Sequence, residues 1–419
     1  MPSDSKMVEV AVVGAGAAGL AAAIFAARAR PGLSIVALDG AKKLGAKILV
    51  SGGGRCNVTN RTVTVGDFWG GSRHVVQRIL NSLSVEETIA FFNEIGVHLH
   101  EEENGKLFPD SNSAKTVLSA LIAEAQRRDV RLLTDHRVTG IRREEVCFEL
   151  ATTSGLIAAR SVVLATGGLS LPKTGSDGGG YHLAESLGHA LTPTTPGLAP
   201  LVLDGDFHPA LSGISHVVEL TIRIEGQKPV RMTGSMLWTH FGVSGPVALD
   251  ASRHWLRARL ELHRVAVSAS FCPGDTFESL EQRFMDLATS NPKAQLRGVL
   301  SERLPNRVAK VVLQHLQIAD QVAMAHLARE DRRRLVRSLL EWPLPVVDSR
   351  GYGVAEVTAG GVPLTEIDPA TMESRKCPGL YLVGEILDVD GRIGGFNFQW
   401  AWSSGCVAGK ALADAAGYS

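Results

Sequence analysis

The segment from Val8 to Asp39 reads VEVAVVGAGAAGLAAAIFAARARPGLSIVALD. The apolar run at 8–13 predicts a strand, and the glycine-rich run at 14–19 predicts a tight turn. An alanine-rich stretch at 20–29 predicts a helix that ends at Pro31-Gly32, and 34–38 predicts a second strand. This β-α-β order around G-x-G-x-x-G is typical of a Rossmann-type dinucleotide-binding unit.

Each position of the glycine motif has its own physical role. Gly14 permits the tight turn, Gly16 leaves room for a pyrophosphate against the backbone, and Gly19 lets the helix pack close to the strand. Ala17 and Ala18 lie in the turn that leads into the helix, whose N-terminus offers free N–H groups and partial positive charge, which favour phosphate.

The second strand ends at Asp39, where a carboxylate can accept hydrogen bonds from a ribose diol. The same charge would repel a 2′-phosphate, so NADP is disfavoured in this position. The motif lies near the start of the chain, as in many FAD enzymes, and no second G-x-G-x-x-G follows a later strand. The sequence therefore predicts one resident dinucleotide, with FAD favoured over NAD.

The domain organisation follows from changes in pattern along the 419 residues. We expect the first part of an α/β FAD-binding domain over 1–195, ending in a proline-rich stretch. An insertion should cover 196–350, with barrel-like antiparallel strands over 196–275, such as 217–224 and 260–267, and a helical part over 276–340. The second part of the FAD-binding domain should cover 351–419.

The charge balance gives no reason to expect an anionic partner. Lys and Arg count 43, and Asp and Glu also count 43. We therefore expect no nucleic acid and no membrane as partner, and we interpret Arg332-Arg333-Arg334 as a solvated helix face. No apolar run reaches the length of a membrane span.

The five cysteines are scattered and include no C-x-x-C pair. This favours a reducing, cytoplasmic compartment without disulfides or a structural zinc, and no metal site is expected. No Ser/His/Asp set or paired-carboxylate pattern stands out either, so no catalytic residue can be assigned. That fits an enzyme whose cofactor carries the electron chemistry.

Longer motifs give a resemblance to a known family. The stretch 47–60, KILVSGGGRCNVTN, resembles the signature of bacterial flavoproteins whose FAD domain is interrupted by an inserted barrel domain. That family includes aminoacetone oxidase and a bile-acid ene-reductase. Three further stretches are similar, and they are THFGVSGP at 239–246, VTAGGVPLTEIDPATMES at 357–374 and GLYLVGEILDVDGRIGGFNFQWAWSSGCVAG at 379–409.

The resemblance implies further cofactor contacts. Glu385 after Gly384 would bind the ribityl chain, with Asp388 as a second candidate. A helix over 399–412, opened by Gly395, would direct its N-terminus at the flavin pyrimidine edge and stabilise negative charge there. The other residues that the resemblance places at the cofactor are Lys47, Arg55, Cys56, Asn57, Val138, Thr166, Gly167, Phe396 and Asn397.

Some family features differ here. Members usually have Glu at the position of Asp39, Tyr at that of Phe396 and Arg at that of Ala46. Losing the tyrosine hydroxyl removes a possible proton donor.

Cys56 could be a redox thiol or a flavin anchor, but packing is favoured because buried cysteine usually behaves as a small hydrophobe.

The sequence thus predicts an FAD-dependent oxidoreductase that transfers hydride at flavin N5, with a small-molecule substrate bound between the flavin and the insertion. Two mechanisms remain open: an amine oxidase that passes electrons to oxygen, and a reductase that accepts hydride from NAD(P)H as a transient donor. The alternatives are an RNA-modifying flavoprotein and a non-catalytic flavin-binding protein. The sequence does not indicate the oligomeric state.

Overall fold

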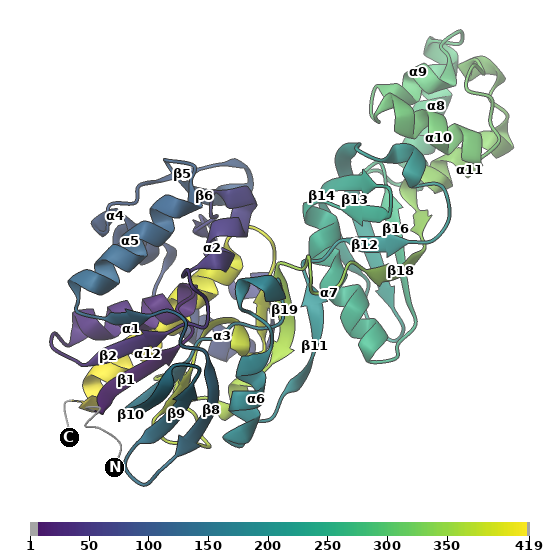
Figure 1. Ribbon diagram of the computed structural model, residues 1–419. Coiled ribbons are helices and arrows are strands. Elements are labelled where there is room, and N and C mark those ends of the chain that lie inside the picture. The colour runs from purple at the N-terminus through teal and green to yellow at the C-terminus, as the bar shows by residue number, and fades with distance from the viewer. Residues whose placement is uncertain (1–6, 417–419) are drawn as a thin grey trace. The chain divides into compact units, whose positions relative to one another are not determined.

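The chain folds into two compact units (Figure 1), and the computed structural model describes residues 7–416. The first unit contains the residues up to Thr195 together with those from Glu356 onward. The second unit is the insertion, Pro196–Ala355. The sequence-based prediction for the insertion was 196–350, whereas this unit spans 196–355.

The main sheet of the first unit is mostly parallel. Strands β20, β10, β1, β2 and β7 run parallel in that order, and β9 and β8 continue antiparallel from the other half of β10. The bounds are β1 (Val8–Val13), β2 (Ile35–Leu38), β7 (Arg131–Leu133), β8 (Val138–Arg143), β9 (Phe148–Thr152), β10 (Gly155–Leu164) and β20 (Leu380–Leu382). Because β1 lies between β2 and β10, its carboxyl end is the switch point where such sheets bind ligands.

Two long helices pack together in the core of this unit, α1 (Ala17–Ala29) and α12 (Phe396–Ala415). Small residues permit the close approach of the helices. A Cβ on Gly405 would lie 2.7 Å from the Ala18 carbonyl oxygen, and one on Gly409 would lie 2.6 Å from that of Ala22. The two helices therefore fix the start of α1 relative to the start of α12.

Shorter elements complete the first unit. The helices are α2 (Ala46–Val50), α3 (Arg73–Leu80), α4 (Val85–Glu94), α5 (Ala114–Arg127) and α6 (Gly179–Ser186). The remaining strands are β3 (Thr59–Asn60), β4 (Phe68–Gly70), β5 (Leu99–Glu101), β6 (Lys106–Pro109), β11 (Thr192–Gly197), β19 (Val357–Gly361) and β21 (Val389–Gly391). Strand β11 pairs with β19 where the chain leaves and re-enters this unit.

The inserted unit has one seven-stranded antiparallel sheet in the order β17-β16-β13-β14-β15-β12-β18. Its strands are β12 (Leu201–Leu203), β13 (Ser215–Ile224), β14 (Val230–Thr239), β15 (Gly242–Ser244), β16 (Val265–Ser270), β17 (Trp342–Leu344) and β18 (Val346–Ser349). Helix α7 (Pro246–Leu260) packs on β13 and β14. Four more helices form a separate helical part, α8 (Phe277–Ser290), α9 (Leu296–Ser301), α10 (Asn306–His315) and α11 (Arg329–Leu340).

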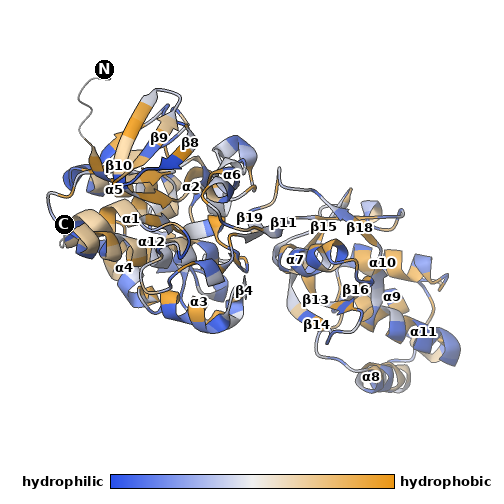
Figure 2. Cartoon of the chain, turned by 90° about the horizontal axis from the view of Figure 1, so that it is seen from below, coloured by the Kyte–Doolittle hydropathy of each residue, from blue (hydrophilic) through white to orange (hydrophobic). Residues whose placement is uncertain are grey.

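The hydropathy of the residues differs between the core of the first unit and one helix of the inserted unit (Figure 2). The strands of the main sheet and the α1–α12 core are largely apolar, whereas α11 is mostly hydrophilic. No helix among residues 7–416 is both long enough and apolar enough to cross a membrane.

The structure corrects two sequence-derived boundaries. The alternating run at 260–267 is not one strand, because Leu260 ends α7 and β16 begins only at Val265. The last helix begins at Phe396, three residues before the predicted start. In the first case an exposed turn at 261–264 separates the helix from the strand, and in the second Gly395, with φ +94°, directly precedes the helix. Apolar spacing located each element but did not show these turns.

Candidate functional site

The turn after β1 has the geometry that the glycine motif requires. Gly14 has φ +99°, and a Cβ there would lie 2.5 Å from the carbonyl oxygen of Ala165, the residue that follows β10. A Cβ on Gly19 would lie 1.9 Å from the Gly14 carbonyl oxygen. In contrast, a Cβ on Gly16 would meet no protein atom within 4 Å. Gly14 and Gly19 are therefore needed by the fold, whereas Gly16 leaves open space at the start of α1.

Asp39 is held against this turn. Its carboxylate accepts hydrogen bonds from the backbone N–H of Ala15 at 3.1 Å and of Ala41 at 2.9 Å, one on each oxygen. Each carboxylate oxygen has two lone pairs, so both can accept a further hydrogen bond. The geometry thus fixes the carboxylate beside Gly16 without using up its acceptor capacity.

The ends of β10 and β20 reach the same edge of the sheet. Gly167 follows β10 with φ +73°, and Gly384 follows β20 with φ +75°. A Cβ on Gly384 would lie 2.7 Å from the Cβ of Ala18 in the first turn of α1. The structure therefore brings the predicted residues at 14–19, Asp39, Thr166-Gly167 and Gly384 to the carboxyl ends of four neighbouring strands.

Glu385 lies in a cluster of polar side chains at this edge. Its carboxylate pairs with Lys47 and accepts hydrogen bonds from the Ser170 hydroxyl at 2.8 Å and the Thr358 backbone N–H at 2.9 Å. Lys47 also donates to the Ser170 hydroxyl at 2.6 Å. The Lys47 and Glu385 side chains remain 29% and 19% exposed, so the cluster is accessible from one side.

Sequence reasoning missed Ser170 and Thr358 as members of this cluster. Ser170 comes two residues after Gly167-Gly168, and Thr358 lies in the 357–374 family stretch. For Ser170, a hydroxyl residue just after a glycine turn that follows a strand is the signal that could have identified it. Thr358 bonds Glu385 through its backbone N–H, for which the sequence offers no signal.

The loop at 55–57 contributes one buried acceptor without a partner. Arg55 points elsewhere, pairing with Glu102 at 2.6 Å and stacking on Phe108 with its guanidinium 4.0 Å from the ring centroid. Cys56 has φ +63°, and complete burial raises the pKa of its thiol to about 12, a value that favours packing over thiolate chemistry. The Oδ1 atom of Asn57 is buried and has no hydrogen-bond partner in the described chain.

The start of α12 is fixed by the strand β3. Gly395 precedes the helix with φ +94°, and a Cβ there would lie 2.5 Å from the Thr59 carbonyl. Phe396 is buried and packs edge-on against Phe68, with ring centroids 6.2 Å apart. The side chain of Asn397 bonds both the N–H and the carbonyl of Gly391, each at 2.8 Å. Phe396 and Asn397 therefore position the helix, whose first N–H groups have no partner within the helix.

Two further predicted residues lie at or beside the strands β8 and β21. Val138 begins β8, and its register partner is Thr152 on β9. Asp388 precedes β21, and its backbone carbonyl accepts the N–H of Gly71 at 2.9 Å. The backbone N–H of His136, two residues before Val138, donates to the Asp39 carbonyl at 2.8 Å, so β8 begins near Asp39.

Comparisons with known proteins agree with this geometry. A family model described as the HI0933-like protein Rossmann domain matches residues 8–411. The ribosomal RNA dihydrouridine synthase of Escherichia coli is 34% identical over 403 residues, covering 96% of this chain and 97% of that protein. The 3-dehydro-bile acid delta(4,6)-reductase of Clostridium scindens is 32% identical over 408 residues, covering 97% and 100%.

Solved structures share the fold at low identity. The quinol fumarate reductase of E. coli aligns with a TM-score of 0.52 at 17% identity, covering 98% of this chain and 71% of that one. The 3-ketosteroid delta1-dehydrogenase of Sterolibacterium denitrificans aligns with a TM-score of 0.51 at 13% identity, covering 98% and 100%. The predicted Rossmann-type FAD domain with an inserted antiparallel part is thereby confirmed. The chain belongs to the HI0933-like family of FAD-binding oxidoreductases.

Proposed function

We propose that this protein is an FAD-dependent reductase that saturates a carbon–carbon double bond conjugated to a carbonyl group. The supporting observation is that relatives over the full chain are named for that kind of change. A dihydrouridine is a uridine whose ring double bond next to a carbonyl has gained two hydrogens, and a delta(4,6)-reductase is named for removing ring unsaturation.

The residues at the switch point fit FAD. The open space at Gly16 and the N-terminus of α1 suit the diphosphate, and Asp39 has acceptor capacity for a ribose diol. The buried Asn57 Oδ1 without a partner is an acceptor suited to a flavin N–H. We assign Lys47 and Glu385 to holding the ribityl chain, because the ion pair fixes both side chains while leaving part of each exposed.

When bound and reduced, FAD would supply the two electrons of this change as a hydride to the β-carbon of the conjugated system. The substrate must also gain a proton at the α-carbon, which makes two hydrogens in all. The N-terminus of α12 carries partial positive charge and would stabilise negative charge on a reduced ring placed against it. NAD(P)H is the proposed external donor of the two electrons.

The test is a product assay with two arms. The purified holoprotein and NADH or NADPH are incubated anaerobically either with unmodified ribosomal RNA transcribed in vitro or with an unsaturated 3-oxo bile acid. Mass spectrometry then follows a gain of two hydrogens per product. We expect that gain in one arm, and the arm in which it occurs identifies the substrate class.

An amine oxidase would behave differently. It would reduce its flavin with aminoacetone or another primary amine and produce hydrogen peroxide in air, with no saturated product in either arm. That result would overturn the reductase assignment while leaving the FAD site in place.

A further inference from the structure

The neutral total charge of the chain conceals an uneven distribution. The inserted unit, 196–355, carries 19 Lys and Arg against 16 Asp and Glu, and the FAD unit carries 24 against 27. The helical part at 276–340 alone has 11 basic residues against 7 acidic ones. We expected no nucleic-acid partner because the net charge of the whole chain is zero. That reason does not apply to the helical part alone, which has an excess of basic residues.

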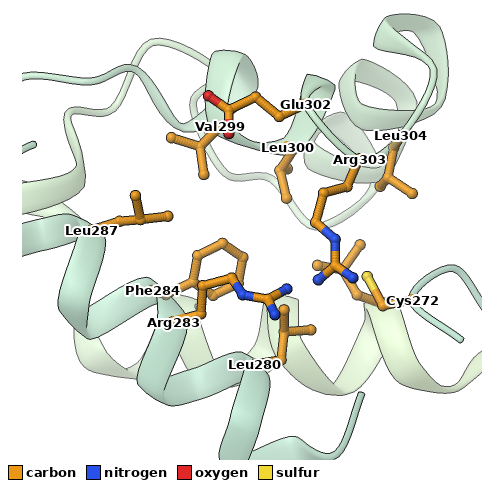
Figure 3. A pocket seen from close by; sticks show the side chains of 11 residues that line it. Cys272, Leu280, Arg283, Phe284, Leu287, Val299, Leu300, Glu302, Arg303 and Leu304 are labelled. Atoms are coloured by element: carbon orange, nitrogen blue, oxygen red, sulfur yellow. The ribbon is translucent and has the colours of Figure 1, made fainter. Parts of the chain in front are cut away.

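Two arginines in the helical part are held in place by a single carboxylate. Arg283 on α8 and Arg303 after α9 both pair with Asp275, at 3.5 Å and 2.6 Å. Asp275 is only 10% exposed, whereas the two arginine side chains are 45% and 40% exposed. Figure 3 shows both guanidinium groups on one side of a small pocket that is open in part to solvent, with Glu302 on the other side. The Asp275 carboxylate thus orients both guanidinium groups, but its single negative charge can neutralise only one of the two positive charges.

The positive charge continues along α10. Arg307 and Lys310 are three residues apart and share the exposed face of that helix, opposite the buried residues Val308, Ala309, Val312 and Leu313. Neither has an ion-pair partner in the described part of the chain. We call the set of four exposed cations Arg283, Arg303, Arg307 and Lys310, from α8 and from the segment 303–310, the basic ridge.

We propose that the basic ridge binds the phosphate backbone of a folded RNA. This inference rests on the proposed function and favours the nucleic-acid arm of that proposal. Guanidinium groups held in one orientation suit phosphate oxygens, which they can bind with two parallel hydrogen bonds. Two further cations without acidic partners add sequence-independent affinity.

An anionic lipid surface is the less suitable partner. A membrane-binding helix needs an exposed apolar face beside its cations. The apolar face of α10 is buried within the unit, and among residues 276–340 the only exposed large hydrophobic side chain is Met285, at 37%.

The experiment measures RNA binding by fluorescence anisotropy at several salt concentrations. The probe is labelled bacterial ribosomal RNA transcribed in vitro, and the protein is the full-length holoprotein. The variant Arg307→Ala/Lys310→Ala removes two cations without leaving an acid unpaired. The matched control is Lys228→Ala/Arg264→Ala, which removes two exposed cations from the turn before β14 and the turn before β16 in the same unit.

We expect the ridge variant to weaken binding roughly tenfold and to lower the slope of log K against log salt by about 1.4 to 1.8, for two phosphate contacts. The control should change both quantities far less. Equal binding by the ridge variant and the wild type, equal losses in the ridge variant and the control, or absence of RNA binding at low salt would each overturn the proposal. So would binding to phosphatidylglycerol vesicles in preference to RNA.

A second readout separates this inference from the proposed function. Anaerobic reduction of the bound flavin by NADH or NADPH should be the same in the ridge variant and the wild type. RNA binding without any saturated product would leave the ridge in place and refute the reductase. Saturation of the bile-acid substrate without RNA binding would refute the ridge and retain the reductase.

Discussion

Two glycines three residues apart in the β1 turn have opposite surroundings. A Cβ on Gly19 would meet the Gly14 carbonyl, but one on Gly16 would meet no protein atom. Gly16→Val should therefore fold with a melting temperature, measured without flavin, within a few degrees of the wild type, because φ at this position is −82°, which any residue can adopt. The variant should nevertheless lose its flavin absorbance near 450 nm, because the side chain would fill the diphosphate space.

Gly19→Ala is the matched control for that prediction. The added methyl group would displace α1 from β1, so we expect destabilisation of about 3 kcal/mol or more, measured by urea unfolding. A Gly16→Val protein that retains one FAD per chain would show that the diphosphate binds elsewhere.

A second prediction at the scale of residues concerns three side chains, Ser374, His189 and Glu366, whose hydrogen bonds resemble those of a hydrolytic triad. The Ser374 hydroxyl lies 2.8 Å from His189 Nε2, and His189 Nδ1 lies 2.8 Å from Glu366. The Ser374 oxygen also accepts the backbone N–H groups of Lys376 and Cys377, and all three side chains are largely buried. Burial further lowers the pKa of His189, against the opposing effect of Glu366.

We therefore expect this set to stabilise the fold and to have no nucleophilic role. A fluorophosphonate probe should not label Ser374 in the native protein. Ser374→Ala should cost about 1–3 kcal/mol in urea unfolding, because it leaves buried donors unpaired. Labelling at Ser374 by mass spectrometry would contradict this account.

The candidate site could be predicted where local sequence dictates local geometry. The glycine turn and Asp39 follow from the spacing within one β-α-β unit. The cluster of Lys47, Ser170 and Glu385 could not be derived that way, because its members are 123 and 215 residues apart in sequence. Only the family resemblance indicated Lys47 and Glu385, and it did not indicate Ser170.

At the scale of elements, the α1–α12 contact carries a prediction about close packing. Gly409→Ala should destabilise the protein by about 1–3 kcal/mol, because the new Cβ would lie 2.6 Å from a backbone oxygen of α1. Gly298→Ala on α9 is the control, since a Cβ there meets nothing within 4 Å and alanine favours the helix. Thermal melts should show a lower transition for the first variant and an unchanged or higher one for the second.

Strands and helices were predicted correctly where the spacing of apolar residues in the sequence matches the repeat of the strand or helix that forms. The strands at 8–13 and 217–224 and the helix at 85–95 have clear periodicities, and each occurs within two residues of its expected bounds. The run at 260–267 failed because alternation continued across the end of α7 into β16. Alternation of apolar and polar residues over four or five positions cannot show where a helix ends and a strand begins, because apolar residues occur on both sides of that junction.

For the whole molecule, buried histidines predict how the inserted unit responds to acid. Burial lowers the pKa of His216 to about 4, and its Nε2 accepts a hydrogen bond from Trp238 Nε1 at 3.0 Å. Between pH 6.5 and 4 the unfolded chain binds a proton at this residue that the folded unit does not bind. Stability should therefore fall as the pH drops through this range.

His216→Gln tests that contribution, because an amide can still accept from Trp238 but does not titrate. We expect the variant to lose roughly 1–2 kcal/mol less than the wild type between pH 7 and pH 4, with solvent screening taken into account. Calorimetry at several pH values measures the difference. Parallel pH profiles for the two proteins would assign the acid sensitivity to other groups.

A single-turnover measurement on the holoprotein without NAD(P)H tests whether the bound flavin itself reduces a conjugated double bond. The holoprotein is reduced anaerobically with one equivalent of dithionite and mixed with unmodified ribosomal RNA or the unsaturated 3-oxo bile acid, while absorbance near 450 nm is recorded. We expect one of these substrates to reoxidise the flavin in the absence of oxygen, with one saturated product formed per FAD. A flavin that stays reduced with both substrates and reoxidises only when oxygen is admitted would contradict it.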